Sequence, residues 1–263
     1  MKYKVPILML LFIFSTMSVA FATPTYFRQN PSSSDDYGGA WVEDVSSSIK
    51  SEIASTGCNI SCMAMDFKTW GFKTVDSFYD ERTGETIAHA NADPYVVYKL
   101  NNNDTYVSDY YALCKKFGTT FNRIVEFASN ATDQTKAQLT DAWLDDGYYP
   151  IGRILKPGTT NHYHSILFIY SSLPGPYNIN SIQNLNNVYT SEAIGDDKNE
   201  INDATELNTK LDGDVVIQAY ESNFKIHDPY VGSNSGGPNI YFDDNIYGKG
   251  FSILKKLLII NKP

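Results

Sequence analysis

The sequence contains one clear candidate for a reactive group, a thiol of one of its three cysteines, Cys58, Cys62 and Cys114. A cysteine attacks a carbonyl carbon as the thiolate, and a free thiol with a pKa of about 8.5 is mostly protonated at neutral pH. The unpaired N–H groups of a helix N-terminus stabilise the thiolate and lower that pKa. Cys58 follows Gly57 and begins an apolar segment that predicts a buried helix. We therefore expect Cys58 to be a nucleophile.

An activated thiol also needs a histidine that carries the proton to the leaving group, a group that holds this histidine, and donors for the oxyanion. His164 begins an apolar strand, which is a rigid position from which to aim an imidazole. Asp228 lies in the stretch Ile226-His227-Asp228-Pro229, just past a predicted strand, and could orient the histidine. Gln29 lies in an extended segment before the cysteine, and its side-chain amide could donate to an oxyanion.

Other arrangements of the cysteines are possible. Cys58 could be an ordinary buried cysteine, since free cysteine is among the most buried residue types. It could also form a disulfide with Cys114. A Cys62–Cys114 disulfide would instead leave Cys58 free. A Cys58–Cys62 bond within one helical turn has poor geometry, because the two side chains run parallel.

The polar candidates also have alternatives. His162 lies two residues before His164, hence on the same face if the strand extends that far, and is the rival base. The two histidines could together bind zinc, but no second pair of ligands follows at a suitable spacing, so we expect no metal. His227 should point away from Asp228 toward solvent. Asp228 with Pro229 could be only a turn, and Gln29 only a surface residue.

Hydrophobic periodicity predicts several helices. A four-residue step of apolar residues predicts a helix over 41–53, and the cysteine helix should run from Cys58 to Gly71. Two short helices are expected within 93–118, and a further one over 133–146, with Asp133 as its N-cap and Gly147 at its end.

Strands are expected in the second half of the chain. Segments 149–155 and 164–170 should form a hairpin around the Pro157-Gly158 turn, and segments 215–220 and 224–226 should be later strands. Segment 173–211 is polar and poorly periodic, and 233–238 is expected to be a glycine-rich loop. The apolar C-terminal cluster over 253–260 is expected to be a final strand or a docked helix.

The N-terminus has the three parts of a cleavable secretory signal. Lys2 and Lys4 are basic, residues 5–19 are largely apolar, and an Ala20-Phe21-Ala22 site precedes Thr23. The apolar run is short for a membrane span, which needs roughly 20 residues. We expect residues 1–22 to be removed and the protein to be secreted or periplasmic. An odd number of cysteines in an oxidising compartment leaves one thiol unpaired.

Charge and composition limit the partners. The chain has 263 residues and a net charge of −9, which becomes −11 when Lys2 and Lys4 leave with the signal. It has no basic patch, so nucleic acid is not expected as a partner. The acidic run over 196–200 lacks the glycine and the terminal glutamate of a calcium-binding loop, and we interpret it as a solvated loop.

The order of several short motifs resembles the bacterial papain-like peptidases. The resemblance is to the group related to bacteriocin-processing, double-glycine leader peptidases, and it covers most of residues 25–230. The motifs are Gln29, Trp41, Gly57-Cys58-Asn59-Ile60-Ser61-Cys62-Met63-Ala64-Met65, Tyr149-Pro150-Ile151, His164-Ser165-Ile166-Leu167 and Ile226-His227-Asp228-Pro229. The chain departs from the family pattern at Asn59, where a glycine often stands, and at Ser165, where an aromatic residue is usual. The gap between His164 and Asp228 is also long.

The resemblance implies an α+β fold in which the cysteine helix packs on an antiparallel sheet that carries His164 and Asp228. Residues 23–263 would form a single papain-like peptidase domain, with 173–211 as an insertion or loop. It implies a cysteine peptidase that acts on a peptide or protein through Cys58, His164, Asp228 and Gln29, with no cofactor. We expect a monomer without stable membrane insertion after signal cleavage. The alternatives are a cell-wall peptide amidase or acyl transferase on the same fold, and a non-catalytic secreted binding or adhesion domain.

Overall fold

The structure is a computed structural model, and it describes residues 24–173, 188–192, 223–232, 235–242 and 253–263. The predicted signal peptide, the acidic run at 196–200 and the predicted strand at 215–220 lie outside these residues. So does most of the segment 173–211. The described part of the chain contains no helix that is both long enough and apolar enough to cross a membrane.

A seven-stranded antiparallel sheet forms the centre of the fold, with the strand order β6-β3-β9-β4-β5-β7-β8. Its strands are β3 (Phe121–Phe127), β4 (Ile151–Leu155), β5 (Tyr163–Ser171), β6 (Val188–Glu192), β7 (Phe224–Gly232), β8 (Ser235–Tyr241) and β9 (Ile253–Ile260). The predicted hairpin is confirmed as β4 and β5, in which Ile154 pairs with His164.

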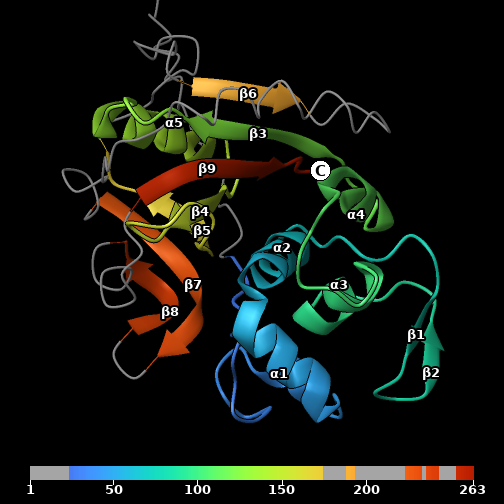
Figure 1. The fold of residues 1–263 in the computed structure, drawn as a ribbon. Coiled ribbons are helices and arrows are strands. Elements are labelled where there is room, and N and C mark those ends of the chain that lie inside the picture. The colour runs from blue at the N-terminus through green and yellow to red at the C-terminus, as the bar shows by residue number, and fades with distance from the viewer. Residues whose placement is uncertain (1–23, 174–187, 193–222, 233–234, 243–252) are drawn as a thin grey trace, which may run out of the picture.

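The described helices pack on both sides of this sheet. They are the 3₁₀ helix η1 (Ala40–Val42), α1 (Ser47–Thr56), α2 (Cys58–Thr69), α3 (Pro94–Leu100), α4 (Tyr110–Lys116) and α5 (Asp133–Asp145). A small hairpin, β1 (Phe78–Asp80) and β2 (Glu85–Ile87), lies beside α3. In Figure 1, α1 to α4 lie together on one side of the sheet and α5 lies on the other. The expected α+β architecture, with helices packed on an antiparallel sheet, is therefore confirmed.

Two hydrophobic cores cover the two faces of the sheet. The larger one joins α1 to α4 to sheet residues such as Ile151, Leu167 and Leu258. The smaller one joins α5 to residues such as Ile166 and Leu257. Successive side chains of a strand point to opposite faces, so neighbours such as Leu257 and Leu258 enter different cores. This two-sided burial explains the continuous apolar runs of the central strands.

The C-terminal cluster is a strand rather than a docked helix. This strand, β9, pairs with β3 on one side and with β4 on the other, so the end of the chain lies in the middle of the sheet. Its interior position explains why an apolar segment of only eight residues is buried from both faces. A strand in this place completes the backbone hydrogen bonds of two neighbours at once, which a helix could not do.

The helix predicted over 41–53 is wrong in its first half. The chain forms a 3₁₀ turn at Ala40–Val42, and Asp44 then has a left-handed φ of 56°, which an α-helix does not allow. The α-helix begins only at Ser47, where the Ser46 hydroxyl accepts a hydrogen bond from the Ile49 N–H. The four-residue spacing of apolar residues therefore continues through a turn, and it does not show that the α-helix starts only after the Ser46 cap.

Three smaller expectations also need correction. The N-cap of α5 is Thr132, whose hydroxyl accepts from the Thr135 N–H, and Asp133 is the first helical residue. The glycine-rich segment 233–238 is not wholly a loop, because β8 begins at Ser235 and pairs with β7. The segment 173–211 contains the edge strand β6, which pairs with β3. The two strands are decided by pairing with a neighbouring strand, whereas the N-cap of α5 is decided by a local side-chain contact.

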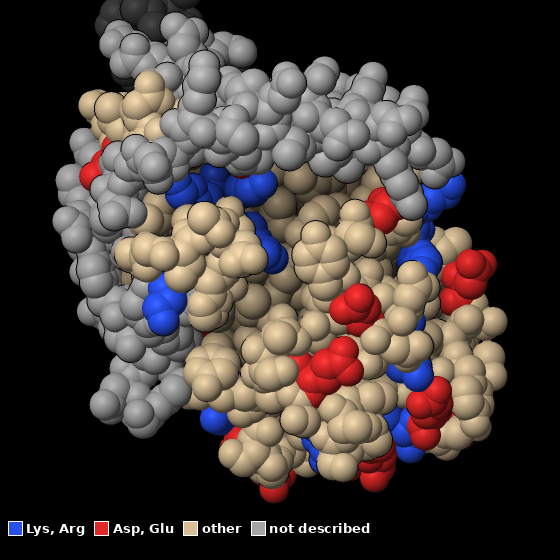
Figure 2. Space-filling view, in the orientation of Figure 1, with Lys and Arg blue, Asp and Glu red and all other residues tan. Residues whose placement is uncertain are grey.

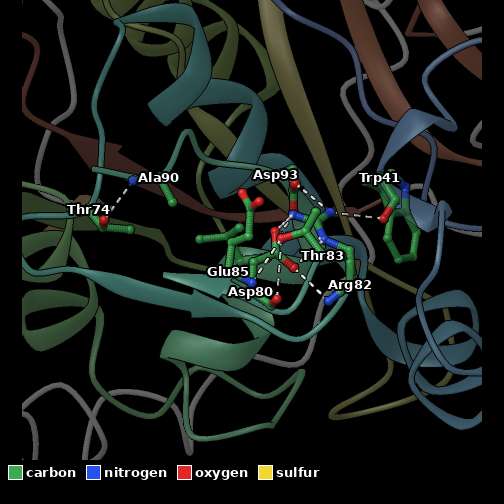
Figure 3. A network of polar contacts seen from close by, with 9 residues as sticks. Trp41, Thr74, Asp80, Arg82, Thr83, Glu85, Ala90 and Asp93 are labelled. Carbon is green, nitrogen blue, oxygen red and sulfur yellow. Dashed lines mark hydrogen bonds and ion pairs between the residues drawn. The ribbon is translucent and has the colours of Figure 1, made fainter. Parts of the chain in front are cut away.

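A partly buried ion-pair network attaches the β1–β2 hairpin to the helical side (Figure 3). Arg82 donates to both carboxylate oxygens of Asp80 at 2.8–3.1 Å, to Asp93 at 2.9 Å and to the carbonyl oxygen of Trp41 at 3.2 Å. Its guanidinium also lies 4.4 Å from the centroid of the Tyr95 ring. Asp93 is the N-cap of α3, so one arginine joins the hairpin, the α3 cap and the segment around η1.

Replacement of Arg82 with methionine is expected to lower the free energy of unfolding by about 3 kcal/mol, because it leaves two partly buried carboxylates without their counter-ion. Equilibrium urea unfolding measures this change. Lys99→Met is the matched control, because Lys99 pairs with Glu81, whose side chain is 54% exposed. An exposed pair of this kind contributes at most about 1 kcal/mol. Equal losses in the two variants would contradict a structural role for the network.

Candidate active site

Cys58 is the first residue of α2, at the point where this helix meets α1. Gly57 is both the C-cap of α1 and the N-cap of α2. A side chain at Gly57 would place its Cβ 2.5 Å from the carbonyl oxygen of Ile53, so only glycine fits immediately before the cysteine. Because α2 has no side-chain cap, its first N–H groups are left to act on the thiol. Only 9% of Cys58 is exposed.

The helix α2 holds this cysteine between the helical layer and the sheet. It packs on α1 and α3 on one side and on β4, β5 and β7 on the other. All residues from Cys58 to Phe67 are buried, which explains why the segment is apolar on most faces. The predicted cysteine helix is therefore confirmed, and its first turn lies against the strands that carry the two other candidates.

His164 and Asp228 form a buried hydrogen-bonded pair. They lie on the neighbouring strands β5 and β7, and the His164 Nε2 is 2.7 Å from the Asp228 Oδ1. Asp228 is fully buried, and its Oδ1 also accepts the Tyr230 N–H at 3.0 Å. Asp228 was expected just past a strand, but it lies within β7, where the register with β8 shifts on both sides of it. Pro229 has no N–H to complete a regular ladder, which explains the irregularity.

Cys58 and His164 are hydrogen-bonded to each other. Because Nε2 is taken by Asp228, the Nδ1 atom of His164 faces the sulfur. Burial by itself raises the pKa of the Cys58 thiol, but the hydrogen bond and charge of His164, the charge of Arg153 and the Ser165 N–H lower it to about 6. Burial lowers the pKa of His164, but Asp228 and Cys58 raise it to about 9. The pair is therefore a thiolate and an imidazolium at neutral pH.

The other two thiols differ from Cys58 in their surroundings. Cys62 and Cys114 are both fully buried and free, so the structure contains no Cys62–Cys114 disulfide, which was one of the arrangements that the sequence left open. Both lie in the larger apolar core, where burial raises the pKa of each thiol well above its ordinary value. A neutral buried thiol fills space as a small hydrophobic group, which accounts for two unpaired cysteines in the core.

Gln29 lies at the edge of the site. Its backbone N–H donates to the carbonyl oxygen of Pro229 at 2.6 Å, and its Nε2 donates to the carbonyl oxygen of Ala54 at 3.1 Å. These contacts place it between the residue after Asp228 and the last turn of α1, four residues before Cys58. Gln29 is 2% exposed, so it is not a surface residue. The amide group has two N–H hydrogens, and the bond to Ala54 uses one of them.

The structure places His162 and His227 apart from the pair formed by His164 and Asp228. His162 is exposed and precedes β5, whereas His164 is buried beside Asp228. His227 was expected on the solvent side, and this is wrong, because it is 3% exposed. Its Nδ1 accepts the Asn239 N–H, so its Nε2 donates to the carbonyl oxygen of Pro24. Burial lowers the pKa of His227. The N-terminal segment covers this face of β7, which the local sequence could not indicate.

Arg153 on β4 is a residue near the site that the sequence interpretation did not single out. Its neighbour Ile154 pairs with His164, and its Nη1 donates to the Ser165 hydroxyl at 3.2 Å. The charge of Arg153 also lowers the pKa of Cys58. A signal was present in the sequence, because Arg153 is the one charged residue in the otherwise apolar predicted strand 149–155.

Comparison with protein-family models, with characterised proteins and with solved structures finds no match for this chain. Its chemistry therefore has to be inferred from the site itself. The site joins a thiol of lowered pKa at a helix N-terminus, a histidine bonded to that thiol, and a buried carboxylate bonded to the histidine. Such a set of groups can carry out nucleophilic acyl transfer.

Proposed function

We propose that this protein is an exported cysteine peptidase with a papain-like arrangement, in which a cysteine helix packs on a sheet that carries a histidine and an aspartate. The observation that carries the proposal is the chain of contacts from Cys58 through His164 to Asp228. Of the three buried thiols, this is the one whose pKa is lowered, and it is the one beside a histidine. A cysteine with only a packing role has no need of such neighbours.

The geometry supports a two-stage mechanism. The Cys58 thiolate attacks the carbonyl carbon of a peptide bond, and a C–S bond forms as the carbonyl π electrons move to the oxygen. The Cys58 N–H and the free amide hydrogen of Gln29 donate to this oxyanion. His164 gives its Nδ1 proton to the leaving amine, and the C–N bond breaks to leave a thioester. Water then attacks the thioester, His164 accepts its proton, and the acid leaves as the thiolate is restored.

Asp228 has a positioning role in this mechanism. Its carboxylate holds Nε2 of His164, so that Nδ1 faces the sulfur, and it stabilises the imidazolium. The bond from the Tyr230 N–H to the same oxygen fixes the carboxylate in turn.

The export part of the proposal depends on residues 1–22, with their basic start, apolar run and Ala20-Phe21-Ala22 site. Sequencing of the N-terminus after secretion tests it, and a chain that begins at Thr23 is the expected result.

Thiol labelling tests the proposed nucleophile directly. At pH 6 a thiol with a pKa of about 6 is half ionised, whereas an ordinary thiol is less than about 1% ionised. Allowing for the lower nucleophilicity of the less basic thiolate, Cys58 should react with iodoacetamide about 10-fold faster than free cysteine. Peptide mapping by mass spectrometry locates the label and gives the rate.

Cys62 and Cys114 are internal controls for this experiment, because both are fully buried and neutral. They should stay unlabelled in the native protein and react only after unfolding. A Cys58 rate at pH 6 no higher than that of free cysteine would remove the basis for the peptidase proposal. So would the finding of Cys58 in a disulfide in the secreted protein.

A further inference from the structure

Arg153 places a positive charge next to the proposed nucleophile. Its Nη1 donates to the hydroxyl of Ser165 at 3.2 Å, and Ser165 directly follows His164. The Ser165 N–H in turn forms a hydrogen bond with the sulfur of Cys58. On the adjacent strand, Ile154 pairs with His164 and Arg153 pairs with Ser165. Ser165 therefore contacts both the guanidinium of Arg153 and the sulfur of the proposed nucleophile.

The guanidinium has donors left for a ligand. An arginine has five N–H donors, and Ser165 takes one of those of Arg153. The guanidinium also lies 5.3 Å from the centroid of the Tyr163 ring, which limits its freedom to move away. No described aspartate or glutamate forms an ion pair with it, whereas Lys256, which pairs with Arg153 in the sheet, is bonded to Glu126 at 3.2 Å. The Arg153 side chain is only partly buried, so a ligand can approach it.

The positive charge of Arg153 contrasts with the net negative charge of the chain. The whole chain has a net charge of −9, which repels anionic substrates in general. Figure 2 nevertheless shows Lys and Arg side chains gathered at a hollow between the sheet and the helices, while most of the Asp and Glu side chains in view lie over the helices. Thiolate activation alone does not require the extra cation, because His164 already supplies the hydrogen bond and a charge.

We propose that Arg153 binds a carboxylate of the substrate next to the scissile bond, so that the site prefers peptides with an acidic group at that position. This inference rests on the proposed peptidase function. A guanidinium can hold a carboxylate through two parallel N–H···O bonds, which orients the substrate as well as attracting it. The carboxylate can come from an Asp or Glu side chain or from the free C-terminus of a short peptide. The chemistry is the same for both sources.

Matched internally quenched peptides test the inference with the full-length secreted protein. One pair differs only by Glu or Gln next to the cleaved bond, and a second pair by a free or amidated C-terminus one residue beyond it. The wild type should cleave one of the acidic members with a kcat/KM about 10- to 100-fold above that of its neutral partner. This ratio corresponds to the free energy that a hydrogen bond to a charged group contributes. The pair that shows the preference identifies the source of the carboxylate.

The ratio between acidic and neutral substrates is the diagnostic quantity for the variants. R153Q should bring the ratio to about 1, whatever its absolute rate, and R153K should retain part of the preference because the charge remains. K156Q is the matched control, because Lys156 is an exposed cation just past β4 and should leave the ratio unchanged.

Two results would overturn the inference. One is a wild type that cleaves acidic and neutral members equally in both pairs. The other is an R153Q protein that loses activity on both members in the same proportion, which would give Arg153 only a role in thiol activation. Neither result affects the proposed peptidase function, since cleavage of the neutral peptides by the wild type would still support it. Failure to cleave any of the peptides, together with an unreactive Cys58, would instead overturn the proposed function.

Discussion

Cys58→Ala is expected to reduce peptide hydrolysis by at least about 10⁴-fold, a loss of about 5 kcal/mol of transition-state stabilisation. Alanine keeps the helix and the small volume at this position but removes the atom that forms the bond to the substrate. The oxyanion donors and the binding contacts would remain, and they account for the residual rate expected in such variants. Progress curves with a fluorogenic peptide, at matched protein concentrations, measure the change.

Cys62→Ala is the matched control for this prediction. Cys62 lies one turn further along the same helix and is fully buried, but burial raises the pKa of its thiol. Its loss should change kcat/KM by no more than about twofold, with a small loss of stability from the vacated space. Wild-type activity in Cys58→Ala would contradict the assignment of the nucleophile. A complete loss in Cys62→Ala with the fold intact would indicate that the wrong thiol was assigned.

His164→Gln is expected to reduce kcat by about 10²–10⁴-fold, which is the contribution of a positioned general acid and base. Glutamine can still donate a hydrogen bond to the buried carboxylate of Asp228, so the fold should survive the exchange. It has no titratable nitrogen and cannot supply a proton to the leaving amine. Burial would also raise the pKa of the thiol once the histidine is gone, and alkylation of Cys58 at pH 6 should slow accordingly.

The pH profile of the wild type provides a second readout of the same pair. The Cys58 thiol has a pKa of about 6, so the rate should fall as the thiolate gains a proton below that pH. The imidazolium of His164 has a pKa of about 9, so the rate should fall again above pH 9, where its proton is lost. These values belong to the coupled pair. We therefore expect a bell-shaped dependence of kcat/KM with a plateau between pH 6 and 9.

His162→Gln is the matched control for His164→Gln. His162 is exposed and lies two residues before His164, which made it the rival base in the sequence interpretation. Its exchange should leave both the rate and the pH profile unchanged. If His162→Gln abolishes activity and His164→Gln does not, the assignment of the base is reversed. If the profile lacks an acid limb near pH 6, the thiol is not activated as proposed.

Much of the candidate site was predictable because its parts are local. Gly57 before Cys58 indicated where the cysteine helix begins, and the structure shows that glycine is required there by the closeness of the Ile53 carbonyl. The apolar runs on either side of Pro157-Gly158 predicted the β4–β5 hairpin that carries His164. Turn residues and hydrophobic periodicity act over a few neighbouring positions, so they can be interpreted without knowledge of the fold.

The expectations that failed depend on residues far apart in the chain. His227 is buried because residues near Pro24 lie against it, and Cys62 and Cys114 remain free because each fills space in the apolar core. Asp228 lies within β7 rather than just past a strand because β7 pairs with β5 on one side and with β8 on the other. Each of these features needs the packing of distant segments, which no local pattern contains.

Local patterns thus predicted the helix that begins at Cys58 and the strand that carries His164, because backbone preferences and alternating burial act over short distances. The tertiary structure was needed to choose His164 over His162, to join it to Asp228 and to bring the charge of Arg153 close to Cys58. It was also needed to distinguish the thiol whose pKa falls from the two whose pKa rises. A thiol acquires its reactivity from charges and N–H groups within a few ångströms, and only the fold determines which groups those are.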